Sequence, residues 1–127
     1  MSERPGTISQ IGQIAIPVKS LDRAIAFYRD VLGLRLLFQA PPQMAFFACG
    51  SVRLLLGVAE SGDDEHRSSL IYFRVGDIDK AWAELVSKGV EFTERPRMVA
   101  KMPDHELWLA TFHDSEGNTL ALMDEKR

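Results

Sequence analysis

His105 and the two acids that flank it, Asp104 and Glu106, are the residues of this sequence best suited to chemistry. A carboxylate beside an imidazole favours its charged form, and such a histidine can transfer a proton or hold a polar ligand. A loop histidine hydrogen-bonded to the backbone has the same sequence pattern, so both interpretations stay open. The sequence therefore predicts His105 as the candidate catalytic residue.

The other reactive side chains fit structural roles better. His66 follows the acidic residues 63–65, which resembles a metal cluster but is typical of a solvated linker. His113 stands beside the predicted turn at Asp114, where it would stabilise the turn or lie at the surface. Cys49 lies in an apolar stretch, where a cysteine behaves as a small hydrophobic residue. As the single cysteine, it excludes an internal disulfide and a cysteine-based zinc site.

Composition restricts the class of protein and of partner. With 127 residues, 46% hydrophobic and 26% charged, the chain has the make-up of a soluble globular protein. A net charge of −3 gives no electrostatic signal for nucleic acid. No apolar run approaches the roughly 20 residues that span a bilayer, and residues 1–6 do not resemble a signal peptide. We expect a cytoplasmic protein with neither a nucleic-acid nor a membrane partner.

The elements that must position His105 belong to a repeated pattern. Residues 18–28 recur as residues 75–85 at a constant offset of 57 (75 − 18), with Val, Asp and two Ala residues identical. Leu21 becomes Ile78, and Arg23 becomes Lys80. A chain of this length with such a repeat is expected to contain two copies of one unit.

Hydrophobic periodicity predicts the same order of elements in both halves. The first module, 8–60, has a helix between Ser20 and Gly33 and strands at 8–18, 34–39, 44–49 and 52–58. The second module, 70–125, has a helix between Asp77 and Gly89 and strands at 70–75, 90–93, 107–113 and 119–123. Residues 61–69 form the linker, and residues 94–106 form a loop. Each module is too small to bury both faces of its sheet, so the two pair in a single domain, 1–127.

Three segments carry a resemblance to a known family: 14–34, with Phe27-Tyr28 and Leu32-Gly33, then 72–79, and the turn 112–118. Together they resemble the vicinal oxygen chelate superfamily, which includes glyoxalase I, methylmalonyl-CoA epimerase, extradiol dioxygenases and the bleomycin and fosfomycin resistance proteins. The resemblance implies an α+β fold, with two pseudo-symmetric βαβββ modules forming curved mixed sheets around a cavity. It also implies a homodimer, and leaves open whether modules pair within or between chains.

The resemblance implies a place for a metal ion. Metal-dependent members hold a divalent ion with side chains from the first and last strand of each module. The repeat puts these positions at Gln13, Leu55, Leu70 and Ala121. Only Gln13 offers a lone pair, whereas a hard divalent ion needs several oxygen or nitrogen ligands. We therefore expect neither the family's metal site nor a cofactor.

Alternation along the strands separates a helix-facing set from a cavity-facing set. The helix-facing set is uniformly apolar: Ile14, Ile16, Val18, Ile71, Phe73 and Val75. The predicted ligand-binding residues are Gln13, Phe47, Arg53, Leu55, Leu70, Tyr72, Arg74, His105, Trp108 and Ala121. Phe46 is the alternative to Phe47, and Arg74 would otherwise bridge a dimer at the sheet edge. A mostly apolar concavity with few polar groups is typical of a small-molecule site.

These observations favour a metal-free protein that binds and sequesters a small molecule, similar to the bleomycin resistance type. The alternative is a lyase or isomerase of the glyoxalase or epimerase type, with His105, Tyr72 or Arg74 in acid–base or oxyanion roles. A third possibility is a structural or regulatory dimer without a ligand.

Overall fold

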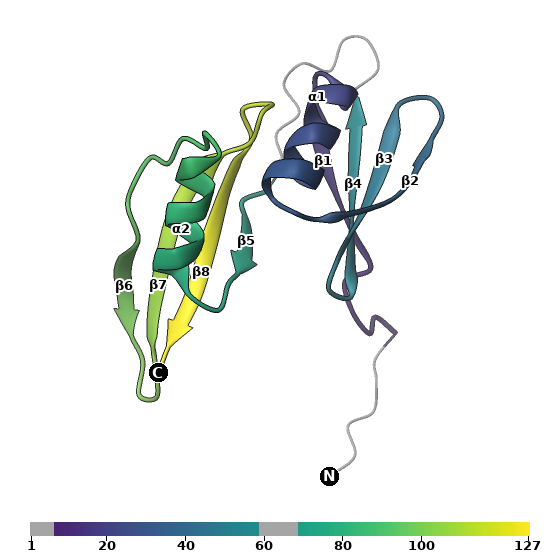
Figure 1. Ribbon diagram of the computed structural model, residues 1–127. Coiled ribbons are helices and arrows are strands. Elements are labelled where there is room, and N and C mark those ends of the chain that lie inside the picture. Colours follow the sequence, from purple (N-terminus) through teal and green to yellow (C-terminus); the bar gives the residue numbers. More distant parts are fainter. Residues whose placement is uncertain (1–6, 59–68) are drawn as a thin grey trace.

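The computed structural model describes residues 7–58 and 69–127, which form two modules of the same design (Figure 1). Each module is a mixed four-stranded sheet with its helix on one face (Figure 1). Sheet 1 has the order β1-β4-β3-β2, with bounds Gln13–Val18, Val52–Val58, Met44–Cys49 and Arg35–Ala40. Sheet 2 has the order β5-β8-β7-β6, with bounds Ile71–Arg74, Thr119–Lys126, Glu106–His113 and Arg97–Lys101. The first and last strands of each module pair in parallel, and the other pairs are antiparallel. The predicted fold class is confirmed.

Both helices begin directly after the predicted caps, and both helical segments end shortly before the predicted glycines. Ser20 caps α1 (Leu21–Ala26), and Asp77 caps α2 (Ile78–Ser87), each accepting from the backbone N–H three residues on. After α1 the chain continues as one π-helical turn, η1 (Phe27–Val31). Gly33 and Gly89 follow the two helices with positive φ of 78° and 89°, which glycine adopts without steric cost.

Three predicted elements differ most from the structure, and β8 also extends to Lys126, beyond the predicted strand 119–123. The strand predicted at 8–18 begins only at Gln13, because Ile8 and Ile11 are exposed and pair with no strand. The strand predicted at 90–93 is a single bridge between Phe92 and Phe112. The strand β6 lies instead inside the predicted loop 94–106. This edge strand is almost wholly exposed, so its sequence lacks the apolar alternation that identifies a half-buried strand.

One contiguous hydrophobic cluster joins the two modules, so neither has a separate core. The helix-facing residues predicted to pack there do so: Ile16 and Val18 are buried, and Phe73 and Val75 pack against the cluster. The predicted linker 61–69, with His66, lies almost entirely outside the described residues. Among the described residues, no helix is long and apolar enough to cross a membrane.

Candidate functional site

The register of the strands decides which predicted residues share a face. In sheet 1, Gln13 pairs with Arg53, and Ala15 with Leu55. In sheet 2, Tyr72 pairs with Ala121. All of these side chains lie on the face opposite the helix, which we call the outer face. Leu70 directly precedes β5 and is 45% exposed.

Arg53 is fixed on an aromatic platform on the outer face of sheet 1. Its Nε donates to Gln13 Oε1 at 2.8 Å. Its guanidinium lies 5.0 Å from the ring centre of Phe46 and 6.0 Å from that of Phe38. The two phenylalanine rings stack on each other, 4.5 Å apart with an interplanar angle of 23°. A guanidinium held this way keeps its charge over the ring faces, where the aromatic quadrupole attracts it.

Two predicted residues are placed elsewhere. Phe47 is fully buried on the helix side, with its ring centre 6.0 Å from that of Tyr28. Trp108 pairs with the buried Asp124. Asp124 accepts a hydrogen bond from the backbone N–H of Ile78, the first residue of α2, so Trp108 also lies on the helix-bearing face. Phe46, the alternative, takes the outer-face position because it pairs with Leu55. The two-residue turn Gly50-Ser51 fixes this register, so the choice between Phe46 and Phe47 could have been made from the sequence.

His105 stands in a charged network at the end of sheet 2. Its Nδ1 lies 2.7 Å from Asp104 Oδ1, and its Nε2 lies 4.0 Å from Glu125 Oε2. The same Glu125 oxygen forms an ion pair with Arg74 Nη2 at 2.8 Å. The structure thus brings His105 and Arg74 together through one carboxylate. The imidazole is only 15% exposed, and Asp104 fixes its orientation.

A cavity of about 570 Å³ lies between the modules. Apolar helix-facing side chains of both modules line it, among them Ile14, Leu54, Ile71, Phe73, Leu85 and Phe112. Of the predicted ligand-binding residues, only Tyr72 and Arg74 border it. The cavity within one chain therefore lies on the helix-bearing side of the sheets, and not on the side predicted. Its charged groups are paired, Arg74 with Glu125 and Lys88 with Glu84, so it presents few polar groups to orient a ligand.

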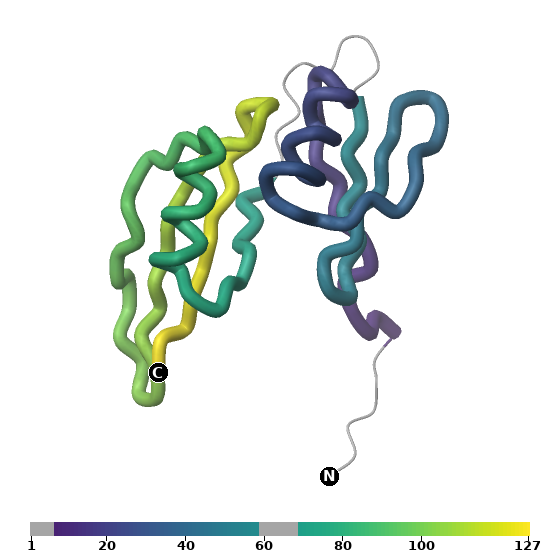
Figure 2. Tube along the Cα trace, viewed as in Figure 1, coloured from purple at the N-terminus to yellow at the C-terminus, as the bar shows by residue number. Residues whose placement is uncertain are grey.

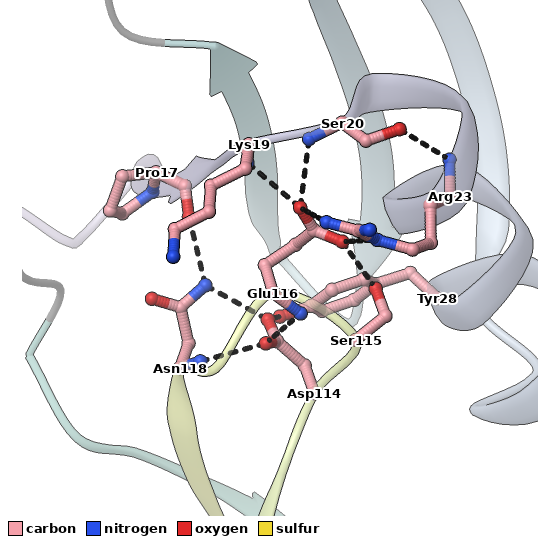
Figure 3. Close-up of polar contacts among 9 residues, drawn as sticks. All are labelled: Pro17, Lys19, Ser20, Arg23, Tyr28, Asp114, Ser115, Glu116 and Asn118. Carbon is pink, nitrogen blue, oxygen red and sulfur yellow. Dashed lines mark hydrogen bonds and ion pairs between the residues drawn. The ribbon is translucent and has the colours of Figure 1, made fainter. Parts of the chain in front are cut away.

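The turn between β7 and β8 connects the modules, and Figure 2 shows it reaching to the start of α1. Glu116 accepts hydrogen bonds from the backbone N–H groups of Lys19 and Ser20, both at 2.8 Å. It also accepts from Arg23 Nε at 2.6 Å and from Ser115 Oγ at 2.8 Å (Figure 3). We call this turn, with the residues it contacts in module 1, the inter-module anchor.

Asp114 forms the second half of the inter-module anchor, and like Glu116 it is buried. It accepts from Tyr28 Oη at 2.7 Å and from the backbone N–H of Glu116 at 2.8 Å (Figure 3). Asn118 Nδ2 donates to Asp114 and to the carbonyl oxygen of Pro17. Burial, reinforced by the Asp114 carboxylate, holds the pKa of Tyr28 well above its usual value, so the phenol stays a donor.

The Glu116 carboxylate is ionised at all ordinary pH values. Burial alone would raise its pKa, but the hydrogen bonds from Arg23, Ser20, Ser115 and Lys19 outweigh this and lower the pKa from 4.5 to about 2. The Glu116 carboxylate of module 2 therefore stays negatively charged beside the start of α1 in module 1.

Comparison with known proteins agrees with this architecture. Residues 10–122 match the family model of the Glyoxalase/Bleomycin resistance protein/Dioxygenase superfamily. The chain belongs to this superfamily. A glyoxylase-like domain-containing protein of Didymella fabae is 32% identical over 124 residues, covering 89% of this chain and 91% of that protein. The resemblance inferred from the three motif segments is confirmed.

Solved structures of the superfamily share the fold. A member from Sphaerobacter thermophilus superposes with a TM-score of 0.75 at 24% identity, covering 93% of this chain and 98% of that one. Lactoylglutathione lyase from Agrobacterium tumefaciens gives a TM-score of 0.72 at 24% identity, covering 94% and 96%. At this identity, the likeness concerns the fold alone.

The residues at the four positions predicted for the family's metal ligands do not fit a divalent ion. Gln13 uses its amide oxygen to accept from Arg53, which also puts a positive charge beside the position. Leu55, Leu70 and Ala121 have hydrocarbon side chains, which cannot ligate a metal. Within 7–58 and 69–127, no group of three or more His, Cys, Asp and Glu residues is arranged to hold a metal ion.

Phe38, Arg35 and the inter-module anchor were not predicted from the sequence. A β-bulge between Leu36 and Phe38 shifts the alternation of β2. Strict alternation would put Phe38 on the helix-facing side with Leu36, whereas its pairing with Phe46 puts it on the outer face. The partners in the anchor are 86 to 101 residues apart, and no local pattern predicts their contact.

Proposed function

We propose that this protein binds a small organic molecule without a metal ion, on the outer faces of its sheets, and sequesters it in the cytoplasm. The observation that carries the proposal is the hydrogen bond from Arg53 to Gln13. The one potential metal ligand among the four positions is thereby engaged by a cation, and an organic ligand can use the guanidinium instead. The stacked Phe38 and Phe46 supply apolar surface beside it.

We further propose that the working form is a homodimer, in which the outer face of sheet 1 of one copy meets that of sheet 2 of the other. Phe38 and Tyr72 are both 47% exposed on these faces. Exposed aromatic side chains with neighbouring apolar surface mark interaction sites. Pairing of two copies would enclose each outer face and so form the ligand cavity between chains.

Metal analysis and light scattering test the proposal. After equilibration with zinc, nickel and manganese salts and gel filtration, elemental analysis should find only substoichiometric metal. Light scattering should give the mass of a dimer, and Phe38→Asp should reduce it to a monomer. The matched control Val86→Asp, at an exposed apolar residue of α2, should leave the dimer intact. One bound metal ion per chain that Gln13→Ala removes would refute the metal-free site, and a monomeric wild type would refute the dimer.

A second candidate function is a metal-free lyase or isomerase. The 2.7 Å contact between His105 and Asp104 favours it, because a carboxylate that orients an imidazole is a common arrangement for general acid–base catalysis. Turnover of a substrate found by screening, abolished in His105→Ala and retained in His113→Ala, would support the enzyme. Ligand binding without turnover in the wild type would support sequestration.

A further inference from the structure

We infer that the ligand is a planar organic anion, with its carboxylate on Arg53 and its ring against Phe38. This inference rests on the proposed function and names the chemical class of the molecule bound. It follows from the charge of sheet 1, from the donors that Arg53 has left, and from the exposed ring of Phe38.

The charge of sheet 1 favours an anion. The four strands β1 to β4 contain no aspartate or glutamate. Arg35 and Arg53 both pair with Ala48, one from each side, so the two arginines and the small alanine form one row across the outer face. Both arginines are exposed. On sheet 2, by contrast, Arg74 is neutralised by Glu125 at 2.8 Å.

The donors of Arg53 suit a carboxylate. Within 7–58 and 69–127, the side chain of Arg53 has one hydrogen-bond partner, Gln13, which occupies Nε, so among these residues nothing engages the two terminal amino groups of the guanidinium. Two parallel N–H donors match the two oxygens of a carboxylate, which is the geometry of a bidentate pair. The contacts with Phe46 and Phe38, together with the hydrogen bond to Gln13, hold the guanidinium on the outer face before the ligand arrives. A preorganised donor loses less conformational entropy on binding than a free side chain.

The exposed ring of Phe38 suits a planar group. Phe46 is buried and covers one side of the Phe38 ring, which is itself 47% exposed. An aromatic ligand that stacks on Phe38 would therefore extend an existing stack and place its carboxylate next to Arg53. A cationic ligand would instead meet Arg35 and Arg53 with no acid in these strands to balance them.

Four probes separate the contribution of the ring from that of the charge. We would titrate the full chain with 1-naphthoate, 1-naphthamide, 1-naphthylmethylamine and acetate by isothermal calorimetry at low ionic strength. Naphthoate should bind at least about tenfold more tightly than the isosteric neutral amide, as expected for one charge-assisted pair. Acetate, which lacks the ring, should bind too weakly to measure. Added salt should weaken naphthoate more than naphthamide, because screening acts on the charge.

Variants assign the two contacts. Arg53→Gln should weaken naphthoate about tenfold and leave naphthamide unchanged. Phe38→Leu keeps an apolar side chain over Phe46 but removes the ring, so it should weaken both naphthyl compounds. The control Arg29→Gln removes the same charge from η1, where Arg29 pairs with Asp30, and should change neither affinity.

The outcomes distinguish this inference from the proposed function. Equal affinity for naphthoate and naphthamide, or no effect of Arg53→Gln, would overturn the anion class. So would tighter binding of 1-naphthylmethylamine, a cation of the same shape, although the protein would then still be a metal-free binder. A stoichiometric metal ion that Gln13→Ala removes would overturn the proposed function itself, whatever the affinity for naphthoate.

Discussion

Replacing Glu116 by glutamine should destabilise the protein through the contact between its modules. Glutamine has the same shape, so it can keep an acceptor toward the N–H groups of Lys19 and Ser20. Its NH₂ group would then face Arg23 Nε, where the carboxylate now accepts at 2.6 Å. The variant therefore loses one charge-assisted bond and brings two donors together, with no change in volume.

The size of the effect follows from the pKa of Glu116. The fall from 4.5 to about 2 corresponds to about 3 kcal/mol of stabilisation at neutral pH. Arg23 is 56% exposed, so solvent screens part of this, and we expect a loss of about 2 kcal/mol. Because the folded-state pKa lies below the unfolded value, this stabilisation is complete above about pH 5 and is lost as the pH falls toward about 2.

Urea unfolding at pH 7.5 and at pH 3, at fixed protein concentration, measures the effect. Circular dichroism reports on both modules, and fluorescence follows Trp82 and Trp108 in the second. At pH 7.5 the midpoint of Glu116→Gln should fall by about 1 M. At pH 3 the difference from wild type should be less than half as large, because the carboxyl group of the unfolded chain is then mostly protonated. The control Glu84→Gln, which breaks an exposed pair with Lys88, should cost less than about 0.5 kcal/mol. An equal loss at both pH values, or one no larger than that of the control, would refute the reasoning.

Three further predictions concern single side chains. Tyr28→Phe removes the donor to the buried Asp114 and should cost about 1–2 kcal/mol in chemical denaturation, so an unchanged midpoint would contradict that bond's importance. Gly33→Ala should cost about 1 kcal/mol from backbone strain alone, because an added Cβ meets nothing within 4 Å. Gly57→Ala, equally open and without positive φ, is its control and should not be destabilised. Burial raises the pKa of Cys49, so iodoacetamide should alkylate it more slowly at pH 7.5 in the native protein than in urea, and equal rates would contradict this.

The fold could be predicted because the sequence repeats local signals. Ser20 and Asp77 are good N-caps by residue type alone, and each caps the helix that follows it. The strands β1 and β4 have core positions on one face, which alternation reveals. The edge strand β6 could not be found this way, because solvent rather than a core faces most of its side chains.

The candidate site was less predictable because it depends on pairing between strands. Phe46 and Phe47 are adjacent and chemically identical, and only the register with β4 puts one outside and the other in the core. The fixed orientation of Arg53 depends on Gln13, forty positions away. Hydrophobic alternation identifies a face, but it does not show which side chains on that face meet.

The inter-module anchor makes the two halves of the chain unequal. In module 1, β3 and β4 are joined by Gly50 and Ser51 alone, whereas the equivalent connection in module 2 is the five-residue turn 114–118. Only the second module can therefore cap a helix of the first. A chimera that combines halves from two relatives would have to inherit this turn and residues 17–28 from the same parent. If the first half alone were duplicated, no residue equivalent to Glu116 would accept hydrogen bonds from the backbone N–H groups at the start of α1.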